Sequence, residues 1–162
     1  MRVTKQNSVY FDLNTLFDDR FNITQIGAVH AASGNSFNEK TNSENIGKRL
    51  KKFVTWLKKV NDGKPVVLIG HNAFGFDAEV LEKVAKKRKV KIPARLVAGY
   101  EDSLQAFRSN YNYKKNDLTS LAKQFGLTRP THDALQDSKL LKKLVNKALE
   151  DTGMNINQFF TE

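Results

Sequence analysis

The chain has 162 residues, with 27 lysines and arginines against 17 aspartates and glutamates, and no cysteine. The length suits a single domain with a sizeable core, and the lack of cysteine excludes a disulfide framework and thiolate chemistry. The sequence contains neither an apolar run of about 18 residues nor a signal-peptide core, so we expect no membrane contact and a reducing location, cytoplasmic or nuclear.

The first half of the chain predicts three strands and a helix. Residues 8–13 are rich in β-branched, aromatic and aliphatic side chains, which is typical of a buried strand. A loop over 16–20 should lead into a second strand at 21–32, and a third strand should begin at 36–38. Apolar residues then recur at helical spacing from Ile46 to near Asn61.

The second half predicts alternating strands and helices. The continuous apolar run at 65–70 indicates a central strand buried on both faces, which implies a parallel neighbour. We expect a helix at 77–89, a last strand at 91–98, short helices at 102–109 and 117–125, a long helix from Asp133, and a weakly patterned tail at 151–162. Strands followed by this alternation predict a mixed α/β sheet with helices on both faces.

Three aspartates are placed on faces that should be apolar. Asp12 lies inside the first strand, where it points the same way as Asn14. Asp77 lies three, four and seven residues before apolar residues of its helix, and Asp137 has the same three offsets in the last helix. One such acid is usually a cap, but three on three elements are hard to explain as caps. Clustered carboxylates repel one another unless cations neutralise them, and oxygen ligands suit Mg²⁺ or Mn²⁺.

Three segments resemble the exonuclease motifs of the DnaQ-like superfamily, in its class with four acids and one histidine (DEDDh). They are residues 10–15 (YFDLNT), 71–77 (HNAFGFD) and 132–137 (HDALQD). Three residues separate Asn72 from Phe76, a spacing more similar to three-prime repair exonucleases and the PML-like exonuclease domain than to proofreading subunits. The resemblance covers 8–149, so we expect one exonuclease-like domain over 1–162, with 151–162 as a tail.

The resemblance implies a ribonuclease H-like mixed sheet of about five strands and a metal-dependent 3′–5′ exonuclease. Its substrate would be DNA or RNA with a free 3′ end, and its cofactors two Mg²⁺ or Mn²⁺ ions. By the same resemblance, Asp12 would bridge both ions, Asp137 would hold one of them with the residue at 14, and Asp77 would act through a water. His132 would be the general base that activates the attacking water, a role that suits an imidazole titrating near neutrality.

Position 14 departs from the family, because this chain has Asn14 where the family has glutamate. An amide oxygen can still bind a metal, but the change removes one negative charge from the site. Three interpretations stay open: a natural variant with weak activity, an inactive relative that keeps the fold, and an engineered neutral replacement of an acid. The alternative function is therefore an inactive nucleic-acid-binding module or a homodimeric scaffold.

The net charge of +10 favours a polyanionic partner, most simply nucleic acid. Residues 83–95 contain seven basic side chains and no acid, and we predict that Lys86, Lys87 and Arg88 contact phosphates, although such runs are often only a solvated helix face. Other candidates for contact with nucleic acid lie beside the acid motifs: Thr15, Leu16, Phe17, Asn72 and Phe74. The three apolar residues among them are equally compatible with a place in the core.

Overall fold

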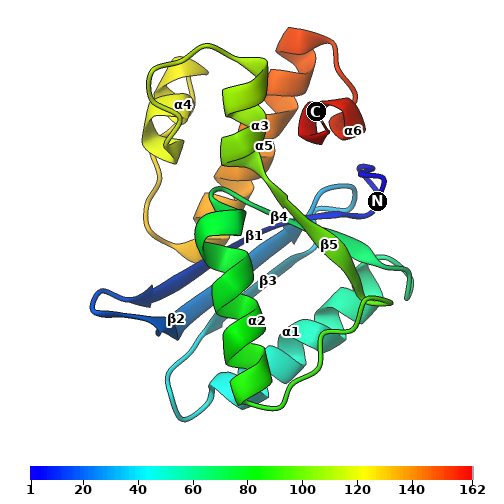
Figure 1. The fold of residues 1–162 in the computed structure, drawn as a ribbon, viewed down its shortest axis with the longest axis vertical. Helices are drawn as coiled ribbons and strands as arrows, with labels where there is room; N and C mark the ends of the chain where they lie inside the picture. The colour runs from blue at the N-terminus through cyan, green and yellow to red at the C-terminus, as the bar shows by residue number, and fades with distance from the viewer. Residues whose placement is uncertain (162) are drawn as a thin grey trace.

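The computed structural model describes residues 1–161, which form a five-stranded sheet with helices on both faces (Figure 1). The strands are β1 (Ser8–Leu16), β2 (Asp19–His30), β3 (Ser36–Lys40), β4 (Val66–Gly70) and β5 (Val97–Asp102). Their order across the sheet is β3-β2-β1-β4-β5, so β1 lies in the middle. Because β1 pairs antiparallel with β2 and parallel with β4, the sheet is mixed, as the sequence predicts.

Six α-helices and one π-helical turn connect and cover the strands. They are α1 (Ile46–Val60), η1 (Ala73–Asp77), α2 (Ala78–Lys87), α3 (Ser103–Asn110), α4 (Leu118–Gln124), α5 (Ala134–Thr152) and α6 (Ile156–Phe160). The helix predicted at 77–89 is thus preceded by η1, which turns the chain tightly after β4. Within 1–161, no helix combines the length and the apolar character that crossing a membrane requires.

The sheet separates two hydrophobic cores. Val9, Phe11 and Leu13 of β1 pack into the core formed with α1 and α2, whereas Tyr10 packs into the core formed with α3 to α6. In Figure 1, α1 and α2 lie in the lower half of the view and the other helices in the upper half. Because side chains alternate along a strand, Asp12 and Asn14 share the face of Tyr10, toward α5.

Two strand boundaries differ from the sequence prediction. The loop expected at 16–20 is only the turn of a hairpin, because β1 continues to Leu16, which pairs with Asp19. The last strand is not at 91–98 but at Val97–Asp102, where its register with β4 runs from Val66↔Val97 to Gly70↔Asp102. That prediction was wrong because β4 supplies hydrogen-bond partners to residues whose own pattern, ending in two acids, is not typical of a buried strand.

A weakly patterned tail is expected at 151–162, but residues 151–161 are largely helical, and residue 162 lies outside the described residues. Helix α5 continues to Thr152, and α6 begins with a capping box in which Asn155 and Gln158 exchange side-chain and main-chain hydrogen bonds. Phe159 is buried in the core on the α5 side of the sheet. Burial of this aromatic side chain, which a short five-residue pattern does not reveal, fixes the segment.

Helix α5 lies very close to the sheet at Gly27 of β2. A Cβ atom at this position would overlap the main chain of Ala134 and Leu135, so only glycine fits. The single proton of the Ser138 hydroxyl is shared between two acceptors, the Ala134 carbonyl oxygen at 2.8 Å and the Gly27 carbonyl oxygen at 3.1 Å, and so links α5 to β2. Gly27 is also the β2 partner of Asp12, so this close approach brings the start of α5 beside Asp12.

We expect Gly27→Ala to lower the free energy of unfolding by about 3 kcal/mol, because the added methyl group must push the α5 backbone away from the sheet. Urea denaturation followed by circular dichroism measures the change. The matched control is Gly47→Ala in α1, where the new Cβ would make an ordinary contact 3.8 Å from the Cβ of Arg88. We expect this control to be neutral or to stabilise the helix by up to about 1 kcal/mol. Equal effects of the two variants would contradict the close approach.

Candidate active site

Asp12 lies at the place where β4 ends. The β1–β4 pairing extends to Tyr10↔Ile69, and β4 itself ends at Gly70. The half-buried Asp12 therefore faces the start of α5 on a part of β1 that has lost its neighbour on one side. An opening of this kind, outside the carboxyl end of a parallel strand, is where open α/β sheets bind ligands.

Asp77 closes the sheet where β4 is missing. It ends η1, its side chain is only 2% exposed, and its Oδ1 accepts the main-chain N–H of Leu13 at 3.2 Å. The carboxylate thus takes the place of a strand partner for β1. The sequence prediction that Asp77 points inward is confirmed by its burial.

Asp137 organises the loop that precedes α5. It lies in the first turn of the helix and is 7% exposed. Its Oδ1 accepts the main-chain N–H of Thr131 at 2.9 Å, and its Oδ2 accepts that of His132 at 3.1 Å. The inward direction predicted for Asp137 is confirmed, and the loop folds around this carboxylate.

Asp12 and Asp77 each lie close enough to another acid of the cluster for its charge to change their protonation. Burial, followed by the charge of Asp137, raises the pKa of Asp12 to about 7. Burial, followed by the charge of Asp12, raises the pKa of Asp77 well above its ordinary value. Within 1–161, no lysine or arginine forms an ion pair with any of the three. Among the described residues, the cluster therefore has no cation that would stabilise its ionised form.

A divalent cation fits the chemistry of these donors. Oxygen ligands that repel one another without a cationic partner are typical of sites for hard metal ions. Asp12 and Asp137, with Asp77 beside Asp12, are the residues that would hold such an ion. Across the described part of the chain, however, no group of three or more His, Cys, Asp or Glu side chains is assembled as a metal site. The acids are gathered, but they are not drawn together around one point.

Asn14 is bound to the protein through its amide nitrogen. Its Nδ2 donates to Gln25 Oε1 at 3.0 Å and to the carbonyl oxygen of His132 at 2.6 Å. Both partners are hydrogen-bond acceptors. A carboxylate in place of this amide nitrogen would offer them no donor and would repel them. The metal-ligand role that the resemblance implied for Asn14 stays a prediction, and this geometry gives the side chain a different use.

His132 is held by its main chain while its ring is left accessible. The residue adopts a left-handed backbone conformation with φ +62°, and its side chain is exposed. Its N–H is bound by Asp137 and its carbonyl oxygen by Asn14. Within 1–161, the imidazole has no hydrogen-bond partner. A base that must accept a proton from water needs an accessible ring of this kind.

The other histidine of the motifs is structural. His71, half-buried after β4, places Nδ1 2.8 Å from the Ser103 hydroxyl oxygen and Nε2 2.6 Å from the Asn116 carbonyl oxygen. Burial lowers the pKa of His71, which favours the neutral ring. His71 therefore ties the end of β4 to α3 and to the loop before α4.

Asp102 fixes the turn that carries Asn72 and Phe74. Its side chain is 2% exposed and accepts the main-chain N–H groups of Asn72 at 2.8 Å, Phe74 at 3.1 Å and Leu104 at 2.9 Å. Asn72 adopts φ +67° and is exposed, and the Phe74 side chain is 54% exposed. The rigid turn thus presents both side chains to solvent near Asp77.

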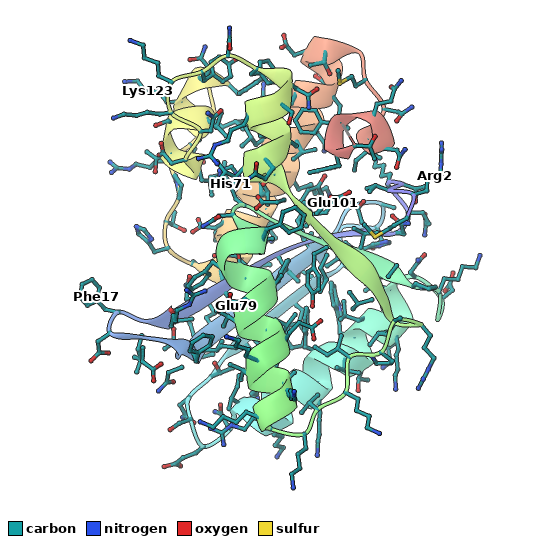
Figure 2. The ribbon with its side chains drawn as sticks, in the orientation of Figure 1. Arg2, Phe17, His71, Glu79, Glu101 and Lys123 are labelled. Carbon is teal, nitrogen blue, oxygen red and sulfur yellow. The ribbon has the colours of Figure 1, made fainter. Side chains whose placement is uncertain are left out.

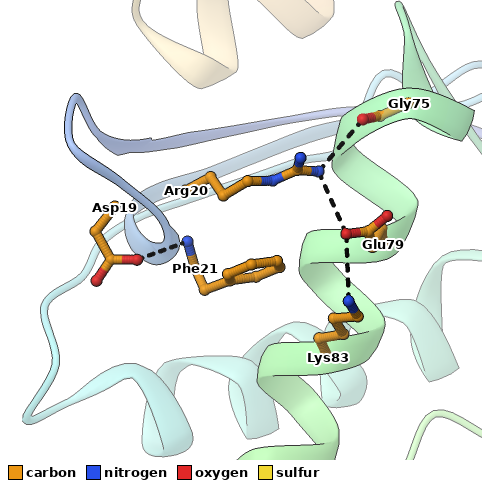
Figure 3. Close-up of polar contacts among 6 residues, drawn as sticks. All are labelled: Asp19, Arg20, Phe21, Gly75, Glu79 and Lys83. Atoms are coloured by element: carbon orange, nitrogen blue, oxygen red, sulfur yellow. Dashed lines mark hydrogen bonds and ion pairs between the residues drawn. The ribbon is translucent and has the colours of Figure 1, made fainter.

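The β1–β2 hairpin is attached to η1 and α2 through Arg20 (Figure 3). The Arg20 guanidinium donates to the Gly75 carbonyl oxygen at 3.3 Å, lies 3.5 Å from Glu79, and stacks over the ring of Phe76 at 5.3 Å. Phe17, at the tip of this hairpin, projects away from the body of the molecule (Figure 2) and is fully exposed.

The other residues predicted to contact nucleic acid lie on β1 and at the end of α2. Thr15 is half-buried, and the adjacent Leu16 is 43% exposed, so both are at the base of the hairpin tip. Lys86, Lys87 and Arg88 are exposed at the end of α2, about 15 Å along the helix from Asp77 at the usual rise per residue. Thr15 and Leu16 thus follow Asp12 on β1 by three and four residues, whereas these three basic residues lie at the opposite end of α2 from Asp77, and contact of either set with nucleic acid stays a prediction.

Sequence reasoning missed two participants, Gln25 and Asp102. Gln25 is 1% exposed and donates from Nε2 to Asp133 Oδ1 at 2.8 Å, which links β2 to the loop before α5. Asp102 was read only as a residue near a helix start. A polar residue inside the apolar second strand was a usable signal for Gln25, because buried amides are almost always hydrogen-bonded.

Comparison with known proteins supports the fold. No protein-family model matches the sequence, and no curated protein matches it either. Among solved structures, Escherichia coli exonuclease I in a zinc-bound complex with single-stranded DNA has 15% identity and a TM-score of 0.68, over 90% of this chain and 41% of that one. The nuclease domain of 3′hExo, described as a DEDDh family member bound to rAMP, has 14% identity and a TM-score of 0.70, over 89% and 92%.

This chain has the ribonuclease H-like fold of these exonucleases. A 3′-exonuclease in a structure of 3′-end recognition of a histone mRNA stem-loop also matches, with 13% identity, a TM-score of 0.68, and coverage of 92% of this chain and 84% of that one. The chain spans about two fifths of exonuclease I. At these identities the similarity establishes the fold class, and the site chemistry must be argued from the residues themselves.

The raised pKa of Asp12 predicts a pH-dependent stability without metal. Between about pH 4 and 7 folded Asp12 keeps a proton that unfolded Asp12 has lost, so the free energy of unfolding should fall as pH rises through this range. His71, whose pKa is lowered, acts in the opposite direction, so the useful quantity is the difference between the parent and Asp12→Asn. In the presence of EDTA, we expect this variant to gain on the parent by on the order of 2 kcal/mol from pH 5 to pH 8. If the free energies of unfolding of the parent and of Asp12→Asn, measured by urea denaturation, changed with pH in the same way, the Asp12 pKa would not be raised in the folded state.

Proposed function

We propose that this chain is a metal-dependent 3′–5′ exonuclease of the DEDDh type that acts on free 3′ ends of DNA or RNA. The motif spacing supports a relation to three-prime repair exonucleases and the PML-like exonuclease domain. The observation that carries the proposal is the convergence of Asp12, Asp77 and Asp137 from three elements, without a protein cation, in a fold shared with exonucleases. A merely structural cluster would be expected to pair its acids with lysine or arginine.

The acids are the proposed metal-binding residues. Asp12 and Asp137 would hold Mg²⁺ or Mn²⁺, and Asp77 would assist beside Asp12. Bound ions of this kind stabilise the charge that develops on the phosphate and lower the pKa of the attacking water. Asn14 supplies no charge, so we propose that the chemistry is weakened.

His132 is the proposed general base. Its exposed imidazole would take a proton from the water whose oxygen attacks the phosphorus of the last phosphodiester. The bond from phosphorus to the 3′ oxygen of the penultimate nucleotide then breaks, and that oxygen takes up a proton from solvent. The products are a nucleoside 5′-monophosphate and a strand one nucleotide shorter. Because its main chain is held by Asp137 and Asn14, His132 needs little rearrangement before reaction.

The exposed apolar residues at the edge of the site are proposed to bind the end of the nucleic-acid strand. Leu16 and Phe17 on the hairpin and Phe74 on η1 expose apolar surface on which bases can stack. Thr15 and Asn72 are proposed to offer polar contacts from the same two segments. Arg20 keeps the hairpin and η1 together, so the two segments would act as one surface.

The second candidate is a nucleic-acid-binding module without activity. It is favoured by one observation, the use of the Asn14 amide nitrogen in bonds to Gln25 and His132. In this case the same surface would hold a strand end that is not cleaved. A homodimeric scaffold stays a prediction from the sequence.

A nuclease assay separates the two candidates. With Mg²⁺ or Mn²⁺, we expect the parent to shorten a 5′-labelled single strand stepwise from its 3′ end and to leave a circular strand intact. His132→Ala should slow this reaction by 10²-fold or more, the range that general bases contribute. Asp12→Asn removes one charge from the acid cluster. Its matched control is Asp62→Asn, which removes one charge from an exposed position whose φ of +52° suits asparagine. Binding without any shortening by the parent would favour the inactive module.

The basic end of α2 is proposed to contact the phosphate backbone farther along the strand. Changing Lys86, Lys87, Arg88 and Lys89 to glutamine should flatten the dependence of log affinity on log salt, because each contacted phosphate contributes about −0.7 to this slope. Fluorescence anisotropy in Ca²⁺ measures the slope for a labelled single strand. The control set removes the same charge from exposed positions of α1: Lys48, Lys51, Lys58 and Lys59. Equal slopes for the two sets would show that α2 has no specific role.

A further inference from the structure

The side chain of Gln25 is the centre of a hydrogen-bond network that joins three strands to the loop before α5. Its Nε2 donates to Asn38 Oδ1 at 2.9 Å and to Asp133 Oδ1 at 2.8 Å. Its Oε1 accepts from Asn14 Nδ2 at 3.0 Å and from the Ala134 main-chain N–H at 3.0 Å. The amide is buried, and its two donor hydrogens and its oxygen all have partners, so the hydrogen-bonding capacity of Gln25 is fully satisfied.

The direction of these bonds is set by two main-chain groups. The N–H of Ala134 can only donate, so the Gln25 atom that faces it must be the oxygen. The same oxygen faces Asn14, which must therefore present its nitrogen. Independently, the carbonyl oxygen of His132 can only accept, and it lies 2.6 Å from the same nitrogen. Two separate main-chain groups thus require a donor at position 14.

We propose that Asn14 is a positioning residue that holds the His132 loop through its amide donor, in place of the metal ligand that an acid would be here. Asn14 binds the carbonyl side of His132 and Asp137 binds the N–H side, so both polar main-chain groups of a residue with φ +62° are held by side chains. That His132 acts as a base rests on the proposed function. The hydrogen-bond pattern that holds its backbone does not.

An acid at position 14 would conflict with the groups that surround Asn14. A carboxylate at position 14 would oppose two acceptors, Gln25 Oε1 and the His132 carbonyl oxygen. Rotating the Gln25 amide by 180° would offer a donor to the new acid, but it would leave the Ala134 N–H facing a nitrogen. The rest of the loop is therefore built for an amide at 14, and a single change to the isosteric aspartate leaves a carboxylate that faces two acceptors.

The network offers a matched pair of variants. Asn14→Asp and Asn38→Asp make the same change from amide to carboxylate, and both residues bind the same Gln25. Asn14 contributes its donor, whereas Asn38 contributes its acceptor oxygen, which an aspartate retains. We expect amide hydrogen exchange at His132 and Ala134 to become about tenfold faster in Asn14→Asp and to stay within about threefold of the parent in Asn38→Asp. The ¹³C shift of the His132 carbonyl should move only in Asn14→Asp, because it reports the loss of one specific donor.

Each outcome of this experiment is informative. Equal acceleration in both variants would show that added charge, and not bond direction, is responsible, and would overturn the proposal. Unchanged exchange in Asn14→Asp would also overturn it. If Asn14→Asp does not fold, Asn14→Ala removes the donor without adding charge and should give the same acceleration at His132, and its absence would again reject the proposal. None of these readouts requires nuclease activity, so a failed nuclease assay and a failed positioning role can be told apart.

Discussion

The mutual repulsion of three largely buried carboxylates is the constraint on which the site depends. Asp12, Asp77 and Asp137 come from a central strand, a π-helical turn and the first turn of the last long helix. Without a cation, burial and the charge of a neighbouring acid favour the protonated forms of Asp12 and Asp77, and part of the folding free energy opposes their ionisation at neutral pH. The surrounding structure must therefore hold in place a group of side chains that would otherwise separate.

The fold holds them with main-chain hydrogen bonds and one close packing contact. The end of β4 leaves a gap that Asp77 fills, and Asp137 binds the N–H groups of the loop that contains His132. Gly27 lets α5 approach β2 so closely that Asp137 and Asp12 face one another. The acids are thus fixed by the backbone and not by ion pairs, which leaves their charge available to a metal ion.

Much of this arrangement could be predicted from the sequence, because it depends on local periodicity. The inward direction of Asp77 and Asp137 follows from their offsets to apolar residues in one helix each. The position of β5 could not be predicted, because its strand character comes from pairing with β4. The role of Asn14 could not be predicted from the sequence either. Its bond direction depends on the Ala134 N–H and the His132 carbonyl, which lie over a hundred residues away and whose orientation is set by a loop with a left-handed residue.

The most direct test of the account is a Mg²⁺ titration of the melting temperature at pH 8. If a metal ion reduces the electrostatic repulsion among the three acids, millimolar Mg²⁺ should raise the melting temperature of the parent by several degrees, because it binds preferentially to the folded state. Asp12→Asn, which removes the central charge, should lose most of this rise. Equal shifts in the parent and in Asp12→Asn, or no shift in either, would contradict the claim that the cluster is a cation site.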